Sequence, residues 1–306
     1  MAQIDQEHSD SLAPFNDGSS DTVSELIKIG TLYGHTDPIT VLKFSSDGKL
    51  LASAGLDGSV KIWDAHHSKL HKNLIGHTEQ IRDLAWSNDG TLLASASMDR
   101  TVRLWDVLAG KCLRILTGHT RAVFRCIFNP RSSLIASGST KGIIHVWDVK
   151  TGNLIKILQR HSRFGRISSL CFTKDGSVII SGSIRGNWCL WDLASEDCLS
   201  TFACDSLISS INMLPTGNGI LIANGDGFIE FWDTPKAIEE TNCFTSFLLR
   251  DNEYISMLES PAKDDLWIVT KCQLHYELYI WSLGEKRIIK YLKNVMGNYL
   301  ILFIVL

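Results

Sequence analysis

Short runs of apolar residues, separated by polar turn signals, recur along most of this chain. In the first clear unit, Asp-Gly turns stand at Asp47-Gly48 and at Asp57-Gly58. Asp-Gly between two apolar runs is typical of a tight turn that joins antiparallel strands. The pattern of this unit predicts four short strands, at residues 39–44, 50–54, 60–63 and 70–74.

This four-strand unit returns through the chain, and a tryptophan in its third predicted strand marks each copy. The tryptophans follow one another at intervals of 41 to 49 residues: Trp63, Trp105, Trp147, Trp191, Trp232 and Trp281. Asp follows the first five directly, and three units open with a Gly-His pair, at 34–35, 76–77 and 118–119. A period near 40 to 45 residues with Gly-His and Trp-Asp ends is typical of WD-repeat blades. The sequence therefore predicts an all-β WD-repeat β-propeller with six recognisable blades.

The two ends of the chain differ from the repeated units. Residues 1–24 are rich in Asp, Ser and Gln, so we expect a disordered leader followed by a propeller over residues 25–306. The apolar tail at 299–306 offers one inner strand of a further blade. We therefore expect an incomplete seventh blade, which fits either a truncated or mispredicted C-terminal end or a genuine protein of six and a half blades.

Polar residues recur inside the first two units at matching positions. The two sets are His35, Ser53, Asp57 and Trp63, and His77, Ser95, Asp99 and Trp105. Ser, His and Asp together could suggest a hydrolase triad. Because the set repeats from blade to blade, we interpret it as a structural hydrogen-bond chain; an unsatisfied buried polar group costs about 1–3 kcal/mol. Lys141 and Arg185 replace the Asp in the third and fourth units.

Charge and motif content narrow the possible functions. The formal net charge is −3, and residues 1–25 carry six acidic and no basic residues, which leaves too small a positive excess elsewhere for a nucleic-acid footprint. The chain has no phosphate loop, zinc-ligand spacing or nucleophile elbow. We therefore expect no enzyme activity, no cofactor and no metal site.

Cysteine usage and hydropathy bear on the compartment. The eight cysteines form no C-x-x-C pair, and several stand in apolar strand patterns, as Cys126, Cys171 and Cys189 do. We interpret them as reduced, buried thiols of an intracellular protein. No secretory signal and no apolar stretch of membrane-spanning length is visible, so we expect no membrane association.

Four segments resemble one particular family of WD-repeat proteins, at residues 83–87, 110–113, 122–130 and 146–152. They resemble the WD-repeat scaffold subunit shared by COMPASS-type histone methyltransferase complexes. The resemblance implies a non-catalytic, nuclear, chromatin-associated scaffold. It also implies a monomer within a larger complex, with a histone tail or methyltransferase-complex subunits as protein partners. The alternative is a WD-repeat adaptor of another assembly, such as a ubiquitin ligase substrate receptor.

The resemblance further implies a peptide-binding site in the central channel. In that family an arginine-bearing peptide enters the channel, where its guanidinium stacks on aromatic faces. The positions of this chain that correspond to the lining are Arg82, Phe124, Ser168, Ser209, Tyr254 and Met257. Phe124 matches one aromatic clamp residue. Met257 replaces the other, Arg82 replaces a serine, and Met98 replaces an aspartate.

These replacements change the charge at a site for cations. A like-charge contact at 4 Å costs on the order of 4 kcal/mol at an effective dielectric near 20. This outweighs a stacking contact worth about 1–2 kcal/mol. We hypothesise that binding of an arginine peptide is weak or lost, and that Arg82 itself occupies the site, stacked on Phe124. The alternative is that Arg82 points into solvent and the site still binds the peptide.

Two further surfaces follow from the sequence. The resemblance implies a second partner surface on the opposite side, at Thr216, Gly219 and Phe231, where the residue types differ from the family pattern. Basic residues expected near the blade tops favour an acidic or phosphorylated ligand, with solvated surface charge as the alternative: Arg82, Lys141, Arg163, Arg166 and Arg185.

Overall fold

The computed structural model describes most of the chain between residues 32 and 292. The described residues are 32–159, 165–195, 197–204, 206–214, 217, 219–226, 228–233, 243–248, 255–259, 267–272, 278–282 and 287–292. All regular structure within them is β. The predicted leader at 1–24 and the predicted tail strand at 299–306 lie outside the described residues.

The described strands form six four-stranded antiparallel sheets, each built from four consecutive strands. The first three sheets are β1 (Ile39–Phe44), β2 (Leu50–Gly55), β3 (Ser59–Asp64), β4 (Lys69–Ile75); β5 (Ile81–Trp86), β6 (Leu92–Ser97), β7 (Val102–Asp106), β8 (Lys111–Leu116); and β9 (Val123–Phe128), β10 (Leu134–Ser139), β11 (Ile144–Asp148), β12 (Leu154–Leu158). The other three are β13 (Ile167–Phe172), β14 (Val178–Ser183), β15 (Asn187–Asp192), β16 (Cys198–Ala203); β17 (Ile208–Met213), β18 (Gly219–Asn224), β19 (Phe228–Asp233), β20 (Cys243–Leu248); and β21 (Ile255–Glu259), β22 (Trp267–Cys272), β23 (Leu278–Ser282), β24 (Arg287–Leu292).

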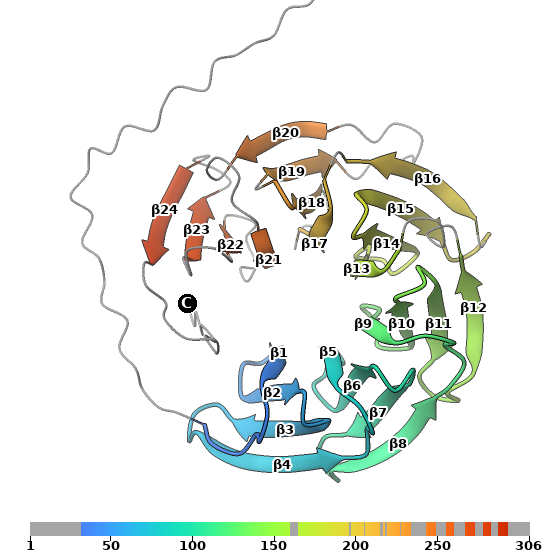
Figure 1. Cartoon of the computed structure of the whole chain (residues 1–306), viewed down its shortest axis with the longest axis vertical. Helices are drawn as coiled ribbons and strands as arrows, with labels where there is room; N and C mark the ends of the chain where they lie inside the picture. Colours follow the sequence, from blue (N-terminus) through green and yellow to red (C-terminus); the bar gives the residue numbers. More distant parts are fainter. Residues whose placement is uncertain are drawn as a thin grey trace, which may run out of the picture.

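The sheets stand around a common centre as the blades of a β-propeller (Figure 1). The first strand of each sheet faces the central opening, and the fourth strand forms the outer rim. The prediction of an all-β propeller is confirmed. The strands predicted for the first unit are also present, each within one residue of its expected bounds.

Local turn chemistry explains where the strands of the first blade end. Gly48 and Gly58 have φ values of 71° and 70°, which only glycine adopts at little cost. The Gly48 amide donates a hydrogen bond of 2.9 Å to the Ser45 carbonyl. The Asp-Gly signals in the sequence therefore mark real reversals of the chain.

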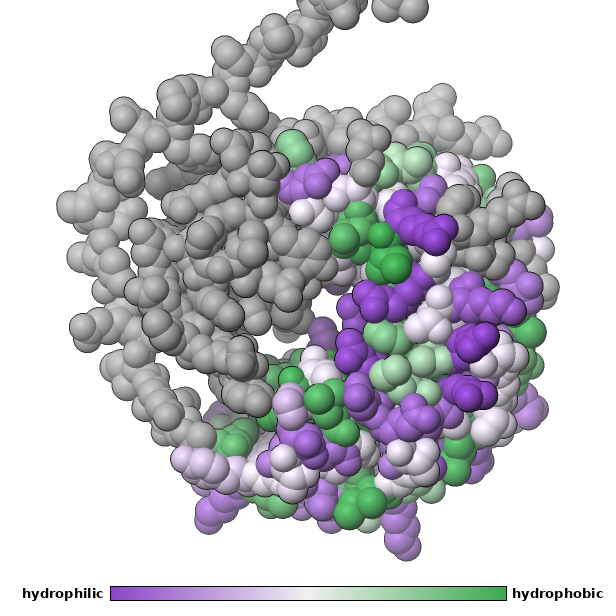
Figure 2. All heavy atoms as spheres, in the orientation of Figure 1, coloured by the Kyte–Doolittle hydropathy of each residue, from purple (hydrophilic) through white to green (hydrophobic). Residues whose placement is uncertain are grey.

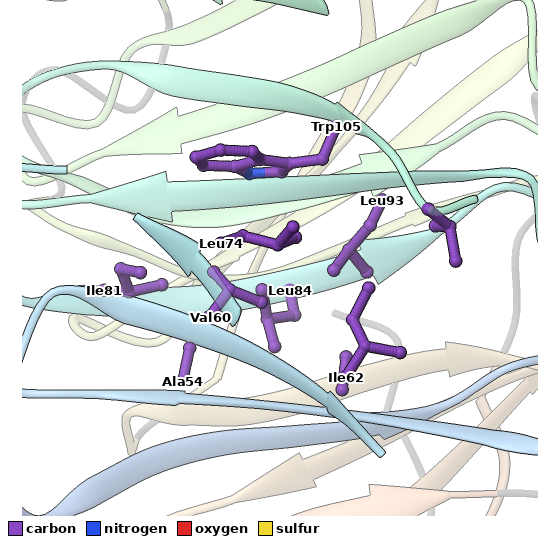
Figure 3. Packing of buried hydrophobic residues seen from close by; sticks show 10 residues of the cluster. Ala54, Val60, Ile62, Leu74, Ile81, Leu84, Leu93 and Trp105 are labelled. Carbon is purple, nitrogen blue, oxygen red and sulfur yellow. The ribbon is translucent and has the colours of Figure 1, made fainter. Parts of the chain in front are cut away.

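The hydrophobic core lies between neighbouring blades rather than within one sheet (Figure 3). Ile62 and Leu74 of the first blade meet Ile81 and Leu84 of the second, and all four are at most 1% exposed. Similar clusters fill the next interfaces around the ring. Since each central strand is covered on both faces, its residues are almost continuously apolar or small, as in β6 and β10.

The cysteines predicted to be buried thiols, Cys126, Cys171 and Cys189, are buried and free of disulfides. Burial raises the pKa of the Cys171 thiol to about 12, so it is not a reactive thiolate. In the part of the chain that the structure describes, no helix has the length and apolar character needed to cross a membrane.

Candidate functional site on the innermost strands

The recurring polar set of the second blade forms one connected chain of hydrogen bonds. The His77 ring joins Asp99 through Nδ1 (2.7 Å) and the Ser95 hydroxyl through Nε2 (2.7 Å). Trp105 Nε1 donates to the same hydroxyl at 2.8 Å. Burial favours the neutral Asp99 carboxyl, but hydrogen bonds from His77 and Thr101 outweigh it and lower the pKa of Asp99. Each of the four side chains therefore makes at least one hydrogen bond within the set.

The first blade repeats this arrangement. His35 joins Asp57 and Ser53, both at 2.7 Å, and Trp63 donates to Ser53 at 2.8 Å. Burial again opposes ionisation of Asp57, while the Ser59 amide and His35 favour it, so the pKa of Asp57 is lowered. The two blades therefore join equivalent strands through the same buried hydrogen bonds.

The third blade has the same His–Ser–Trp hydrogen bonds, but a second histidine lies beside the first and the Asp is absent. His119 still meets the Ser137 hydroxyl at 2.7 Å, which also accepts from Trp147 at 2.8 Å. The His145 ring stacks on His119 with centroids 3.8 Å apart and planes at 10°. Burial, together with the charge of His145, lowers the pKa of His119 to about 3. Both rings are therefore neutral near pH 7.

Each innermost strand carries one extra residue near its start. On β5, Ile81 pairs with Ser97 and Asp83 pairs with Ala96, so Arg82 has no cross-strand partner. The same register shift occurs in all six described blades, and the extra residues are Thr40, Arg82, Phe124, Ser168, Ser209 and Ser256. A β-bulge turns its extra side chain away from the regular pleat. We call these six positions the bulge ring.

Four of the residues predicted to line a peptide site belong to the bulge ring: Arg82, Phe124, Ser168 and Ser209. They lie on consecutive blades, on strands that surround the central opening (Figure 1). Met257 pairs with Lys271 one residue after the bulge of β21, where Ser256 is the extra residue. Tyr254 lies outside the described residues.

Cations gather on the ring of Phe124. The Arg82 guanidinium carbon lies 4.8 Å from the Phe124 centroid, which is the stacking that the sequence hypothesis expected. The Arg166 guanidinium carbon lies over the same ring at 4.6 Å. Burial, then the charges of Arg166 and Arg125, lower the pKa of Arg82. Arg82 and Arg166 therefore already lie over the ring on which an incoming arginine would stack.

Arg125 connects this cluster to the next blade. Its Nε donates to the Ser168 carbonyl at 2.5 Å, and a terminal nitrogen donates to the Phe124 carbonyl at 3.3 Å. The neighbouring Asp83 is buried and accepts from the amides of Cys126 and Leu84, both at 3.0 Å. Burial raises the pKa of Asp83, although Arg125 and Lys43 oppose that rise.

The two serines of the bulge ring have different surroundings. The Ser209 hydroxyl donates to the Ala223 carbonyl at 3.0 Å. Ser168 is 6% exposed, and its hydroxyl has no hydrogen-bond partner among the described residues. Ser209 is therefore already satisfied, while Ser168 can bind a further polar group.

The predicted second surface is only partly described. Gly219 begins β18, is buried and pairs with Asp233 across the sheet, so it offers no side chain to a partner. Phe231 lies on β19 opposite Leu221. Thr216 lies outside the described residues, as does Arg163 of the predicted basic set. Lys141 and Arg185 are exposed.

Sequence reasoning did not assign Arg125 to the site and named Arg166 only as a surface cation. Arg166 directly precedes the first residue of β13, and Arg125 follows Phe124. Basic residues next to bulge positions on adjacent strands were the available signal. Their convergence on one ring depends on the blade geometry, which the sequence pattern does not specify.

Four-stranded blades around a central opening, with His–Ser–Trp hydrogen bonds inside them, define a WD-repeat β-propeller. A family model described as the IFT122 first beta-propeller matches residues 22–242, and the chain belongs to that family.

Solved structures agree on the fold. The chain is similar to the crystal structure of the Cps50 (Swd1) β-propeller domain of Myceliophteria thermophila, with a TM-score of 0.76 and 20% sequence identity. The match covers 89% of this chain and 88% of that domain. At this identity the likeness concerns the fold alone.

Curated relatives match short segments. Ribosome assembly protein 4 of Chaetomium thermophilum is 40% identical over 60 residues, 20% of this chain. Transcription factor unc-37 of Caenorhabditis elegans is 49% identical over 43 residues, 14% of this chain, and Target of rapamycin complex subunit wat1 of Schizosaccharomyces pombe is 38% identical over 50 residues, 16% of this chain. These matches span only 10%, 7% and 16% of the relatives' own lengths. They report shared repeats rather than a shared function.

Proposed function

We propose that this protein is a non-catalytic scaffold that holds a segment of a partner protein against its bulge ring. Support comes from a contrast between two sets of repeated positions. The positions that tie strands together keep His, Ser and Trp from the first blade to the third. The bulge ring carries a different mixture of residues from blade to blade, as Thr40, Arg82 and Phe124 do.

That contrast has a physical reason. A residue outside the cross-strand ladder contributes little to the sheet, so its side chain is available for contact with a ligand. A recognition surface needs different groups at neighbouring positions, whereas a structural one needs the same group in each repeat. Varied side chains around one opening, from blades with a shared framework, are therefore what a binding platform requires.

We further propose that the assembly is the nuclear, chromatin-associated type of the histone lysine methyltransferase complexes. The support is the sequence resemblance over four segments, together with a fold shared with the Swd1 propeller domain. The mode of binding differs from the family pattern, because Arg82 and Arg166 lie over the Phe124 ring. In this proposal the protein does not bind an arginine peptide at that ring.

An adaptor role in another assembly, such as a ubiquitin ligase substrate receptor, is the second candidate. The observation that favours it is the cationic character of the site, where Arg82 has Arg166 and Arg125 as electrostatic neighbours. A cationic site selects acidic or phosphorylated segments. The two candidates share the platform and differ in the partner.

The experiment is affinity purification of the tagged full chain followed by mass spectrometry. Recovery of methyltransferase-complex subunits supports the first candidate, and recovery of ligase subunits supports the second. The Phe124→Ala variant serves as the site-specific comparison, and we expect it to lose the partner while its far-ultraviolet circular dichroism is unchanged. Equal recovery of all partners by Phe124→Ala would contradict a role of the bulge ring.

Localisation of a fluorescently tagged chain gives an independent readout. The chromatin proposal expects nuclear signal that co-extracts with chromatin. Signal excluded from the nucleus contradicts the chromatin proposal and leaves the binding platform itself intact.

A further inference from the structure

We propose that Phe124 and the arginines around it form a receptor for a single anionic group, a phosphate or carboxylate on a side chain of the partner peptide. The inference deepens the proposed function and rests on it, since it specifies the chemistry of the segment that the bulge ring holds. It reverses the ligand charge that the family resemblance implies.

The first support is the arrangement of the guanidinium groups. Arg82 and Arg166 come from different blades, and their guanidinium carbons lie 4.8 Å and 4.6 Å from the centroid of one ring. A planar guanidinium that stacks through its face keeps its N–H groups in its own plane, where they can reach an acceptor. Both guanidinium groups therefore lie against one ring, and the charge of Arg166 acts on Arg82.

The second support is the electrostatic environment of Arg82. Its guanidinium is half-buried, and the charges that act on it are those of Arg166 and Arg125, both positive. Burial and like charges together disfavour the cationic form and lower the pKa of Arg82. An anion at this place removes the repulsion and accepts charge-assisted hydrogen bonds, which are shorter and stronger than neutral ones.

The carboxylate of the next residue in the chain, Asp83, is occupied elsewhere. Asp83 uses its oxygens for the amides of Cys126 and Leu84, at 3.0 Å each, and so joins the second blade to the third. Its cationic neighbours are Arg125 and Lys43. Asp83 therefore serves the interface between blades and does not neutralise Arg82.

The third support is the presence of polar atoms that can still accept a partner. Arg82 Nε and Ser168 Oγ are buried and have no hydrogen-bond partner among the described residues. Both belong to the bulge ring, and the Ser168 carbonyl accepts from Arg125. Nε can only donate, so an acceptor oxygen satisfies it and a guanidinium ligand does not. The hydroxyl can donate to a second oxygen of the same anion.

The size and charge of the surface favour a peptide over a nucleic acid. The formal net charge of the chain is −3, whereas a polyanion needs an extended basic surface. Hydrophilic residues gather along the edge of the central opening near β9 and β13, while apolar residues flank them on both sides (Figure 2). A small cationic spot of this kind recognises one charged group.

The test is fluorescence anisotropy of the full chain with three labelled peptides of one sequence. The central residue is phosphoserine, glutamate or arginine, and the flanking residues are neutral. We expect the phosphoserine peptide or the glutamate peptide to bind and the arginine peptide not to bind. The phosphoserine and glutamate arms distinguish the two sources of the anion. An unlabelled single-stranded oligonucleotide is the competitor.

Matched variants locate the binding. Arg82→Ser and Arg166→Ser each remove one positive charge at Phe124, and each is expected to weaken binding of the anionic peptide about tenfold or more. Arg131→Ser is the control, because this substitution also removes one positive charge. Arg131 is exposed and follows the C-terminal end of β9, whereas Phe124 lies near its start. We expect Arg131→Ser to bind like the unaltered protein.

Several results would overturn the inference. Binding of the arginine peptide as tight as that of the anionic ones would do so, as would equal weakening by Arg82→Ser and Arg131→Ser. Competition by the oligonucleotide that is lost in Arg82→Ser would assign the site to nucleic acid instead. Failure of all three peptides, combined with Phe124-dependent recovery of a partner from cells, contradicts the anion receptor alone. Failure of both experiments contradicts the proposed function as well.

Discussion

One serine hydroxyl holds two rings inside each of the first three blades. In the second blade the Ser95 hydroxyl meets His77 Nε2 at 2.7 Å and Trp105 Nε1 at 2.8 Å. All three side chains are at most 8% exposed, so neither ring can turn to water for a replacement. The hydroxyl therefore contributes more to stability than its size suggests.

Ser95→Ala is expected to lower the free energy of unfolding by about 2 kcal/mol or more, because two buried ring nitrogens lose their partner. Urea unfolding followed by tryptophan fluorescence measures the change. Ser68→Ala removes a hydroxyl from an exposed loop and is expected to stay within about 0.5 kcal/mol of the unaltered protein. Equal effects of the two substitutions would show that the hydrogen-bond chain is not a stabilising feature.

The stacked histidines of the third blade predict a dependence on pH. The pKa of His119 falls from 6.5 to about 3 on folding, so between these values the unfolded state binds more protons. The free energy of unfolding therefore decreases as pH falls through this window, by up to about 1.4 kcal/mol per pH unit. Urea unfolding at a series of pH values from 6.5 to about 5 measures this decrease above the usual titration range of carboxylates.

Lys141→Asp provides the matched variant for this measurement. The first two blades have a carboxylate, Asp57 or Asp99, beside the histidine that corresponds to His119. The substitution places a carboxylate at the equivalent position of the third blade. A carboxylate next to His119 favours its charged form, so the loss of stability on acidification should become smaller. An unchanged pH profile would assign the acid sensitivity to other groups.

In the third and fourth blades, a glycine on the second strand lies close against the next blade. A Cβ added to Gly138 on β10 would lie 2.6 Å from Cγ2 of Ile167, which begins β13. The corresponding Gly182 on β14 has the same relation to Ile208 on β17. These contacts set the spacing between consecutive blades and with it the positions of the bulge ring.

Gly138→Ala is expected to destabilise the protein by about 1–3 kcal/mol through overpacking against Ile167. In an Ile167→Ala background the same change should cost less, since Cγ2 at 2.6 Å and Cγ1 at 3.2 Å are gone and only Cβ of residue 167, at 2.8 Å, still clashes. A double-mutant cycle by urea unfolding measures the coupling between the two positions. Additive effects would show that the clash is relieved elsewhere.

Strand-level structure was largely predictable, because periodic apolar runs and Asp-Gly turns specify strand positions directly. The predicted strand at 39–44 coincides with β1, and Phe124 was correctly placed on an innermost strand. The bulges were not predicted, since one extra residue per strand leaves the apolar pattern readable in either register. The position of Ser256 in the bulge ring was missed for this reason.

From the first blade to the fifth, side chains of the innermost strands join each blade to the next. Thr40 donates to the Ile81 carbonyl at 2.5 Å, Asp83 accepts from Cys126, and Arg125 donates to Ser168. The Ser169 hydroxyl accepts from the Ile211 amide at 2.9 Å. Each connection lies between two adjacent blades, so stability should respond locally to its loss.

Ser169→Ala is expected to reduce amide-exchange protection at the boundary between β13 and β17 by about tenfold, the effect of losing roughly 1.4 kcal/mol of local stability. Protection in β1–β8 should stay unchanged. Hydrogen exchange followed by mass spectrometry of peptic fragments makes the comparison. A uniform decrease over all blades would indicate that the ring opens as one unit.

The register shifts on the innermost strands also govern how such a molecule can acquire new ligands. A residue such as Arg82 stands outside the hydrogen-bond ladder, so its exchange leaves strand pairing untouched. Specificity can then be altered at such a position without a change in the pairing of the strands that carry it. Engineering of the selectivity of this chain should therefore begin at Arg82 rather than at Thr40, whose hydroxyl joins the first blade to the second.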